Sequence, residues 1–408
     1  MASAVSPDLE EVAVSMEVPE LRRSWDVVVV GAGPAGAMVA REVALGGGNV
    51  LLLDRDEFPR WKVCGACLSP GAQDALRRSG LGALPGQLGA ESLAFLTLRG
   101  WGRTARIPLR GTLALSRWAL DKALVQAAIE AGSAFLPGTR ARWLEGTEEA
   151  ARLRVDHSND SSEITAKVVI AADGLRSGLL AGAGLRTGPA PSHARGRVKI
   201  GLGAVIREEG AQYGPGEIHM MVDPQGYVGV VRTEDGLLNV AAALNRSALT
   251  ESGSPAELIR RVLARAGGPA LKGEVLAGWK GTPALGYRPY RLGGRRILAV
   301  GDAAGFVEPF TGEGMGWALA GARALAPLVQ EAVEGWNPEV PGHWEEIYSR
   351  TVLPAQRLSR SLAWTLGRPL SARILLEFLT HLPGMAGPFV QRAANPPSLH
   401  SIPAGSTH

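Results

Sequence analysis

The fold of this chain is decided by residues 25–54, W-D-V-V-V-V-G-A-G-P-A-G-A-M-V-A-R-E-V-A-L-G-G-G-N-V-L-L-L-D. The apolar, β-branched run Val27–Val30 has the length of a buried parallel strand. A glycine-rich turn follows it, then a helix that ends at three glycines, then a second apolar strand over 49–53. This order of elements predicts a strand–turn–helix–strand unit.

The turn carries the spacing G-x-G-x-x-G in Gly31, Gly33 and Gly36. The first glycine permits a tight turn, the second lets the backbone approach a pyrophosphate, and the third lets the helix pack against the strand. Asp54 closes the second strand, where a carboxylate can accept hydrogen bonds from a ribose. We therefore expect this unit to bind a dinucleotide.

Composition indicates a globular protein. The chain has 408 residues, enough for two domains, and its formal net charge of +4 comes from scattered Lys and Arg, so nucleic acid is not an expected partner. It has no apolar run of about 20 residues that would cross a membrane. We expect a cytoplasmic monomer or dimer, with the apolar segment 370–390 as a candidate for peripheral membrane contact.

The cysteines and histidines do not suggest a metal site. Cys64 and Cys67 form a single C-x-x-C pair, whereas zinc needs four ligands, and the seven histidines are scattered. The pair is either a redox disulfide or two loop residues, and the sequence leaves both interpretations open.

Two further buried strands end in glycine and an acid. Lys167–Ala172 leads into Asp173-Gly174, and Arg296–Val300 leads into Gly301-Asp302. Such strand ends lie at the carboxyl edge of a parallel sheet, where ligands bind. Residues 196–244 contain four further strand patterns with turns between them, which indicates an antiparallel sheet in a second domain.

Together these motifs resemble the FAD-dependent oxidoreductases of the para-hydroxybenzoate hydroxylase fold, over roughly residues 24–335. The resemblance implies that the first motif holds the ADP half of FAD and that Asp173-Gly174 shapes the approach of the pyrophosphate and the nicotinamide. It also places Asp302 on the ribityl chain. Arg117, in S-R-W-x-L-D-x-x-L, matches the arginine of that family that contacts FAD.

A closer resemblance is to the geranylgeranyl reductase branch of this fold, whose members saturate prenyl double bonds by hydride transfer from reduced FAD. Residues 62–70, K-V-C-G-A-C-L-S-P, resemble its K-x-C-G-x-x-L-S signature, and 306–314, F-V-E-P-F-T-G-E-G, resemble its loop over the flavin. The resemblance implies that Cys64 and Gly65 lie near the flavin. It also implies that the backbone of Gly312 and Gly314 faces the pyrimidine carbonyl.

These arguments give two sets of candidate residues. The cofactor-binding candidates are Gly31, Gly33, Ala35, Gly36, Asp54, Arg55, Cys64, Gly65, Arg117, Asp173, Gly174, Gly301, Asp302, Pro309, Gly312, Gly314 and Met315. The catalytic candidates are Cys64, Glu308 and Tyr227. Because only one dinucleotide fingerprint is present, NAD(P)H would bind transiently, or a partner reductase or ferredoxin would supply electrons.

One predicted strand differs in sequence from the pattern of the geranylgeranyl reductase branch. Gly226-Tyr227 begins its usual G-Y-x-W-x-F-P strand, but Gly229, Val231 and Arg232 stand where Trp, Phe and Pro are expected. Small or charged residues thus replace aromatics that shape the substrate pocket. The hydrophobic substrate is then either prenyl-like or a bulkier, partly polar natural product.

Other reactions use the same scaffold. A group A monooxygenase would hydroxylate or epoxidise an aromatic or polyketide-like substrate through a flavin C4a-hydroperoxide. A halogenase is less favoured because the W-x-W-x-I-P segment is missing, and a non-enzymatic FAD-binding module is the remaining interpretation.

The expected fold is α/β, or α+β overall, with a Rossmann-like FAD-binding domain, an antiparallel-sheet substrate domain and a helical C-terminus. The expected divisions are a disordered leader (1–22), a discontinuous FAD-binding domain (23–88, 111–188 and 285–335), a substrate domain (89–110 and 189–284) and a C-terminal helical region (336–408).

Overall fold

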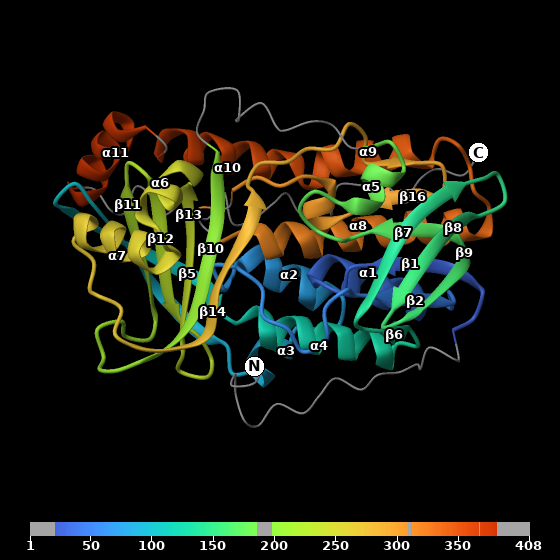
Figure 1. Ribbon diagram of the computed structural model, residues 1–408, viewed down its shortest axis with the longest axis horizontal. Helices are drawn as coiled ribbons and strands as arrows, with labels where there is room; N and C mark the ends of the chain where they lie inside the picture. The colour runs from blue at the N-terminus through green and yellow to red at the C-terminus, as the bar shows by residue number, and fades with distance from the viewer. Residues whose placement is uncertain (1–20, 186–197, 309, 311, 367, 382–408) are drawn as a thin grey trace.

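Two β-sheets lie side by side along the long axis of the molecule, with helices around both (Figure 1). The structure, a computed structural model, describes residues 21–185, 198–308, 310, 312–366 and 368–381. None of its described helices is both long and apolar enough to cross a membrane.

The first sheet has a parallel core that begins with the opening stretch of sequence. Its strands run in the order β15 (Gly293–Gly294), β16 (Ile297–Ala299), β9 (Asp160–Ala171), β1 (Ser24–Val30), β2 (Val50–Leu53) and β6 (Ala134–Leu136). The three predicted parallel strands are confirmed within β1, β9 and β16, which pair in parallel, while β15 pairs antiparallel with β16. β7 (Thr139–Gly146) and β8 (Ala151–His157) extend the sheet through antiparallel pairs with each other and with β9.

Helices cover this sheet because its central strands are apolar on both faces; Val27, Val28 and Val29 are fully buried. The helices that pack here are α1 (Pro34–Leu45), α4 (Arg117–Glu130), α5 (Gly178–Gly182), α8 (Gly314–Glu334) and α9 (Val340–Thr351). Ser116 caps the N-terminus of α4 and accepts a bond from the Ala119 amide at 3.0 Å. The short helices α2 (Pro70–Arg78) and α3 (Leu84–Gln87) follow the second strand of the opening unit.

The second sheet is mixed rather than antiparallel. Its strands run in the order β14 (Gly273–Ala284), β10 (Lys199–Glu208), β13 (Leu238–Asn245), β12 (Gly226–Arg232), β11 (Glu217–Asp223), β4 (Glu91–Gly100), β5 (Arg103–Ala114) and β3 (Cys67–Leu68). The strands within residues 196–245 pair antiparallel, as predicted, but β11 pairs with β4 in parallel, so the sheet as a whole is mixed. The chain passes through the first sheet between these two strands, so no hairpin turn fixes their relative direction.

The two faces of the second sheet have different covers. α7 (Pro255–Ala266) packs with α6 (Arg246–Ser252) on the outer face, against Met221, Val228 and Val230. We call the opposite face the inner wall. It carries Met220, Val222 and Tyr227, and it meets Phe310 and the C-terminal helix α11 (Pro369–His381).

Candidate active site

Three strand-end loops meet at the carboxyl edge of the first sheet. At Gly31, whose φ is +106°, a Cβ would lie 2.2 Å from the Ala172 carbonyl oxygen, just before Asp173. At Gly301, whose φ is +63°, a Cβ would lie 2.9 Å from the Ala35 Cβ. The backbones approach too closely for any larger residue, so the motifs that the sequence assigned to one dinucleotide are in contact.

A buried chain of charges runs beside this junction. Arg60 donates from Nη2 to Asp54 Oδ2 at 2.9 Å and from Nη1 to Asp121 Oδ2 at 2.7 Å. Arg117 donates from Nε to Asp121 Oδ1, also at 2.7 Å. Asp121 is fully buried. It therefore holds two guanidinium groups in place.

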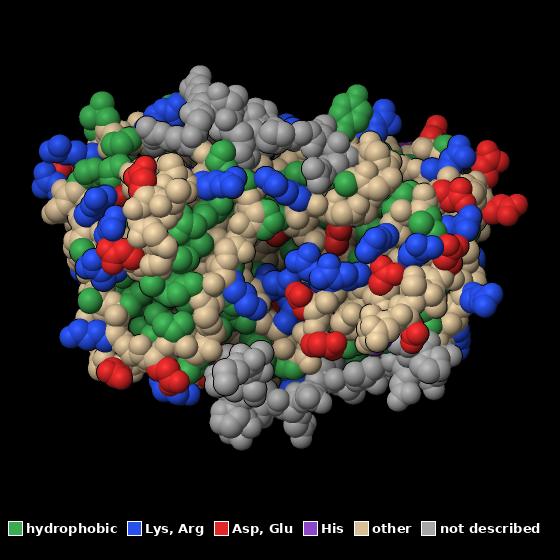
Figure 2. All heavy atoms as spheres, viewed as in Figure 1, with side chains coloured by type: hydrophobic (Ala, Val, Ile, Leu, Met, Phe, Trp, Pro, Cys, Tyr) green, Lys and Arg blue, Asp and Glu red, His purple; other side chains and the backbone are tan. Residues whose placement is uncertain are grey.

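The two guanidinium groups face the glycine-rich turn. A Cβ at Gly33 would lie 3.4 Å from Arg117 Nη2 and 3.9 Å from Arg60 Nη2. Burial alone would lower the pKa of Arg117, but the Asp121 carboxylate raises it above its usual value. Figure 2 shows a hollow near the middle of the molecule with Lys and Arg side chains beside it. Two fixed cations at a bare turn backbone fit the pyrophosphate of FAD.

Sequence reasoning missed Arg60 and Asp121. Asp121 was detectable, because it stands four residues after Arg117 on the same helix, the spacing of an intrahelical ion pair. The partners of Arg60 had no comparable signal, since Asp54 and Asp121 lie on separate segments of the chain.

Asp54 is buried and hydrogen-bonded, whereas Arg55 is exposed. The Asp54 carboxylate accepts bonds from the Ala32 amide at 2.8 Å and the Asp56 amide at 3.0 Å, besides Arg60. Its ribose contact stays a prediction, and a ribose would have to share these oxygens. The Arg55 side chain is 62% exposed and lies 3.9 Å from Asp56.

The Asp173-Gly174 loop leaves one oxygen available. Asp173 Oδ2 accepts bonds from the amides of Gly178 at 2.7 Å and Leu179 at 3.3 Å. The buried Oδ1 has no hydrogen-bond partner among the described residues. Burial raises the pKa of Asp173, although the Ser177 hydroxyl and the backbone amides oppose that shift. An acceptor left open beside the junction fits a hydroxyl of the cofactor.

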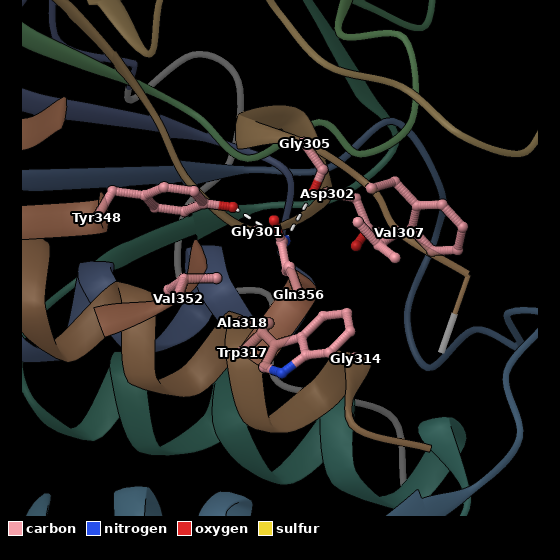
Figure 3. A pocket seen from close by; sticks show the side chains of 11 residues that line it. Gly301, Asp302, Gly305, Val307, Gly314, Trp317, Ala318, Tyr348, Val352 and Gln356 are labelled. Atoms are coloured by element: carbon pink, nitrogen blue, oxygen red, sulfur yellow. Dashed lines mark hydrogen bonds between the residues drawn. The ribbon is translucent and has the colours of Figure 1, made fainter. Parts of the chain in front are cut away.

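The loop with Asp302 is held from behind by the C-terminal helices. Figure 3 shows Gln356, from α10 (Leu353–Leu366), between the Gly305 carbonyl and the Tyr348 hydroxyl. Its Nε2 lies 3.3 Å from the Gly305 oxygen and 3.1 Å from Tyr348 Oη. Asp302 itself is exposed at the front of this loop. The sequence predicted helices in this region but no link from them to the loop.

The predicted flavin loop packs on the C-G-x-C segment. At Gly312, whose φ is +83°, a Cβ would lie 2.5 Å from the Cys67 Cβ. The Met315 side chain points into the core and is 4% exposed, so only its backbone is available to a cofactor. Gly314 begins α8, and Pro309 lies outside the described residues.

Both cysteines are free thiols. Burial raises the pKa of Cys64, with the nearby Arg117 opposing, and burial also raises the pKa of Cys67. Both shifts favour the protonated thiol over the reactive thiolate, which disfavours the redox interpretation. Gly65 is exposed, with open space around it.

The other two catalytic candidates come together with a lysine that the sequence did not single out. Lys199 Nζ, on β10, lies 2.8 Å from Glu308 Oε1 and 5.4 Å from the centroid of the Tyr227 ring. The Phe310 ring packs edge-on against Tyr227, with centroids 4.9 Å apart. Burial raises the pKa of Tyr227 well above 10, and Glu308 adds to the shift. Tyr227 is therefore a neutral hydroxyl on the inner wall.

The expectation of a charged residue in the substrate pocket is wrong. Side chains alternate along a strand, so Tyr227, Gly229 and Val231 share one face and Arg232 takes the other. Arg232 donates to the Tyr213 carbonyl at 3.0 Å and pairs with Glu208 on the outer side. At Gly229, a Cβ would lie 2.9 Å from the Met220 sulfur, so Met220 occupies the space of the missing aromatic.

The described residues contain no group of three or more His, Cys, Asp or Glu side chains arranged to hold a metal ion. The site is thus built from glycine backbone, arginines, single acids and an apolar wall. These parts define a flavin-dependent oxidoreductase of the para-hydroxybenzoate hydroxylase fold.

The chain belongs to the FAD binding domain family, which matches residues 24–340. It is 30% identical over 357 residues to digeranylgeranylglycerophospholipid reductase 2 of Methanopyrus kandleri, covering 82% of this chain and 86% of that protein. It is 29% identical over 356 residues to menaquinone reductase of Mycolicibacterium smegmatis, covering 82% and 83% of the two chains.

A solved structure agrees in fold. The geranylgeranyl bacteriochlorophyll reductase-like protein of Thermoplasma acidophilum superimposes with a TM-score of 0.71 at 22% identity, over 91% of this chain and 96% of that one. The chain is therefore an FAD-dependent enzyme of the geranylgeranyl reductase-like branch.

Proposed function

We propose that this enzyme reduces a carbon–carbon double bond in a hydrophobic, isoprenoid-like substrate. The observation that carries the proposal is a neutral hydroxyl, Tyr227, set in an apolar wall beside the flavin loop. The names of the two relatives point the same way, because both describe substrates with isoprenoid chains.

The inner wall suits an apolar chain. Around Tyr227 and Phe310 it consists of buried aliphatic side chains, which come from both sheet and helix: Leu96, Leu98, Ile107, Met220, Val222, Leu285 and Leu376. An isoprenoid chain against this wall would lose its contact with water at no cost in unpaired polar groups. Met220 over Gly229 gives the wall a flexible side chain where the branch has a rigid aromatic.

Saturation of an alkene needs a hydride on one carbon and a proton on the other. FAD, when bound, supplies the hydride. Tyr227 Oη gives the proton, and the Lys199 ammonium stabilises the tyrosinate that forms. Glu308 holds that ammonium through its 2.8 Å ion pair. Burial raises the pKa of Tyr227, so the hydroxyl still carries its proton when the substrate binds.

The experiment follows the atoms that enter the product. The FAD-loaded enzyme is run in D2O with air and NADPH, using digeranylgeranylglycerophospholipid and menaquinone as probes. Reduction places deuterium on the former alkene carbons and adds no oxygen, which mass spectrometry detects. A product that has gained an oxygen atom and kept its double bonds elsewhere would reject the proposal.

Oxygenation is the second candidate. The pair Met220 and Gly229 favours it over a strict prenyl reductase, because the aromatic residues of the G-Y-x-W-x-F-P strand are replaced. A flexible Met220 side chain in place of a rigid aromatic lets this part of the wall adapt to an aromatic substrate. The same labelling experiment identifies this outcome.

We further propose that electrons reach the flavin from NAD(P)H bound transiently, or from a reductase or ferredoxin. Rapid reduction of the bound flavin by NADPH alone supports the first source. The cytoplasmic location and the monomeric or dimeric state expected from the sequence belong to the same proposal, and sedimentation of the purified protein tests the latter.

A further inference from the structure

The helix α11 is apolar on two opposite faces. One face, which consists of Ala372, Leu376 and Leu379, is buried against the inner wall. The other presents large hydrophobic side chains spaced four residues apart, here called the apolar stripe: Leu370 is 72%, Ile374 61% and Phe378 45% exposed. Exposed apolar side chains in a row on one helix mark an interaction surface.

Positive charge is concentrated in the same C-terminal part of the chain as the apolar stripe. From residue 353 to residue 408 the chain has five arginines and one acidic residue, a formal charge of +4, equal to that of the whole protein. Four of these arginines lie in the described helices or between them: Arg357, Arg360, Arg368 and Arg373. The single acid, Glu377, is paired with Arg103 at 2.5 Å. All of the protein's excess charge therefore belongs to this C-terminal part.

An exposed tryptophan lies next to one of these arginines, on the helix before the apolar stripe. Trp364, near the end of α10, is 59% exposed, and the Arg368 guanidinium lies 3.6 Å from its ring centroid. In Figure 1, α11 lies at the upper left, and Figure 2 shows hydrophobic side chains beside Lys and Arg side chains at that corner. Tryptophan, arginine and an aliphatic row are the side chains that occupy a membrane interface.

The positive charge of this C-terminal part decides which partner can cover the apolar stripe. A second copy docked face to face would set arginines against arginines. Residues 382–408 of this chain add Arg392 and no acid, so they bring no negative charge to the surface. A bilayer of anionic phospholipid offers apolar chains to the stripe and phosphates to the arginines.

We propose that α10 and α11 dock this enzyme on an anionic phospholipid surface, with the apolar stripe in the outer acyl region. The buried face of the same helix packs against the wall that carries Tyr227 and Phe310. Docking would thus place the catalytic wall one helix away from the lipid. Docking on phospholipid goes beyond the proposed reaction, and binding to vesicles is measured without turnover.

The test is vesicle binding by the full-length, FAD-loaded protein. Vesicles of phosphatidylglycerol and phosphatidylcholine in roughly equal parts are compared with vesicles of phosphatidylcholine alone, by sedimentation. We expect binding to the anionic vesicles to be stronger by about tenfold or more and to weaken in salt.

Two variants and two matched controls locate the surface. The stripe variant is L370S/I374S/F378S, and its control is L45S/V275S, which changes exposed apolar residues elsewhere. The charge variant is R357Q/R360Q/R368Q, and its control is R142Q/R207Q/R265Q, which removes the same charge from other exposed positions. We expect each variant to lose about tenfold in vesicle affinity and each control to bind like the wild type.

Three results would overturn the proposal. They are no binding of the wild type to anionic vesicles, binding that is equally strong in the stripe and charge variants, and a dimer in solution that the stripe variant separates. Full FAD content and unchanged circular dichroism establish that each variant is folded, so that lost binding is assigned to the surface.

Discussion

Asp121 is the single anion between Arg60 and Arg117, and nothing in its environment gives it access to water. We expect Asp121→Asn to lower the free energy of unfolding of the apoprotein by about 3–5 kcal/mol, because Arg117 then loses the carboxylate it pairs with, while Arg60 keeps its close pair with Asp54. Urea denaturation measures the loss.

The control for this change is Asp74→Asn, which removes a carboxylate from exposed pairs with Arg77 and Arg78. It should cost about 1 kcal/mol or less. Equal losses in the two variants would contradict the structural role of Asp121.

Gly312 tests the contact between the flavin loop and the C-G-x-C segment. Gly312→Ala would put a Cβ 2.5 Å from the Cys67 Cβ, so the loop must move, and we expect FAD affinity to fall by about tenfold or more. Gly102 has a similar φ of +71° with open space around it. Gly102→Ala should therefore cost about 1 kcal/mol of stability and leave FAD binding unchanged. Titration of the apoproteins with FAD compares them, and equal affinities would remove the loop from the site.

At the scale of elements, the C-terminal helices support the Asp302 loop through Gln356. Gln356→Leu leaves the Gly305 carbonyl without its bond from α10, and an unsatisfied buried carbonyl costs about 1–3 kcal/mol. We expect FAD to dissociate roughly tenfold faster. Gln330→Leu removes a similar bond, from α8 to the Glu42 carbonyl at the far end of α1, and serves as the control. A faster release in both variants would point to general loosening of the fold.

The outer face of the second sheet carries a pH-sensitive group. Burial lowers the pKa of His219 below its usual 6.5, with Glu217 opposing, and His219 packs edge-on against Tyr213 at 5.1 Å. The folded protein keeps this ring neutral where the unfolded chain would bind a proton. Its stabilising contribution is therefore complete above about pH 6.5 and is lost as the pH falls below that value.

We expect His219→Phe to flatten the dependence of stability on pH between about 5 and 7, and His343→Gln, at an exposed histidine, to leave it unchanged. Thermal unfolding across this pH range measures both. An unchanged slope in His219→Phe would show that other groups titrate.

For the whole molecule, the sequence predicts those features that depend on residues close together in the chain. The glycine spacing, the buried strands and the helix α1 follow from residues close together in sequence. The meeting of three strand-end motifs also followed, because parallel strands place their carboxyl ends on one edge. The alternation along β12 would likewise have placed Arg232 on the outer face.

The contacts that the sequence did not predict join residues or strands that are far apart in the chain. Lys199 and Glu308 are separated by 109 residues, and Gln356 lies 51 residues from Gly305. The parallel pairing of β4 with β11 and the strand β14 likewise come from tertiary contacts rather than from a local pattern. No single-sequence signal reports such contacts, because each partner alone is an ordinary surface residue or strand.

The central claim is that the flavin reduces the substrate directly, and a single anaerobic turnover tests it. The FAD-loaded protein is reduced with dithionite and mixed with digeranylgeranylglycerophospholipid while the flavin absorbance is followed. We expect the oxidised flavin band to return without O2 as the lipid gains hydrogen. A band that returns only when O2 is admitted, with no change in the lipid before then, would contradict that claim.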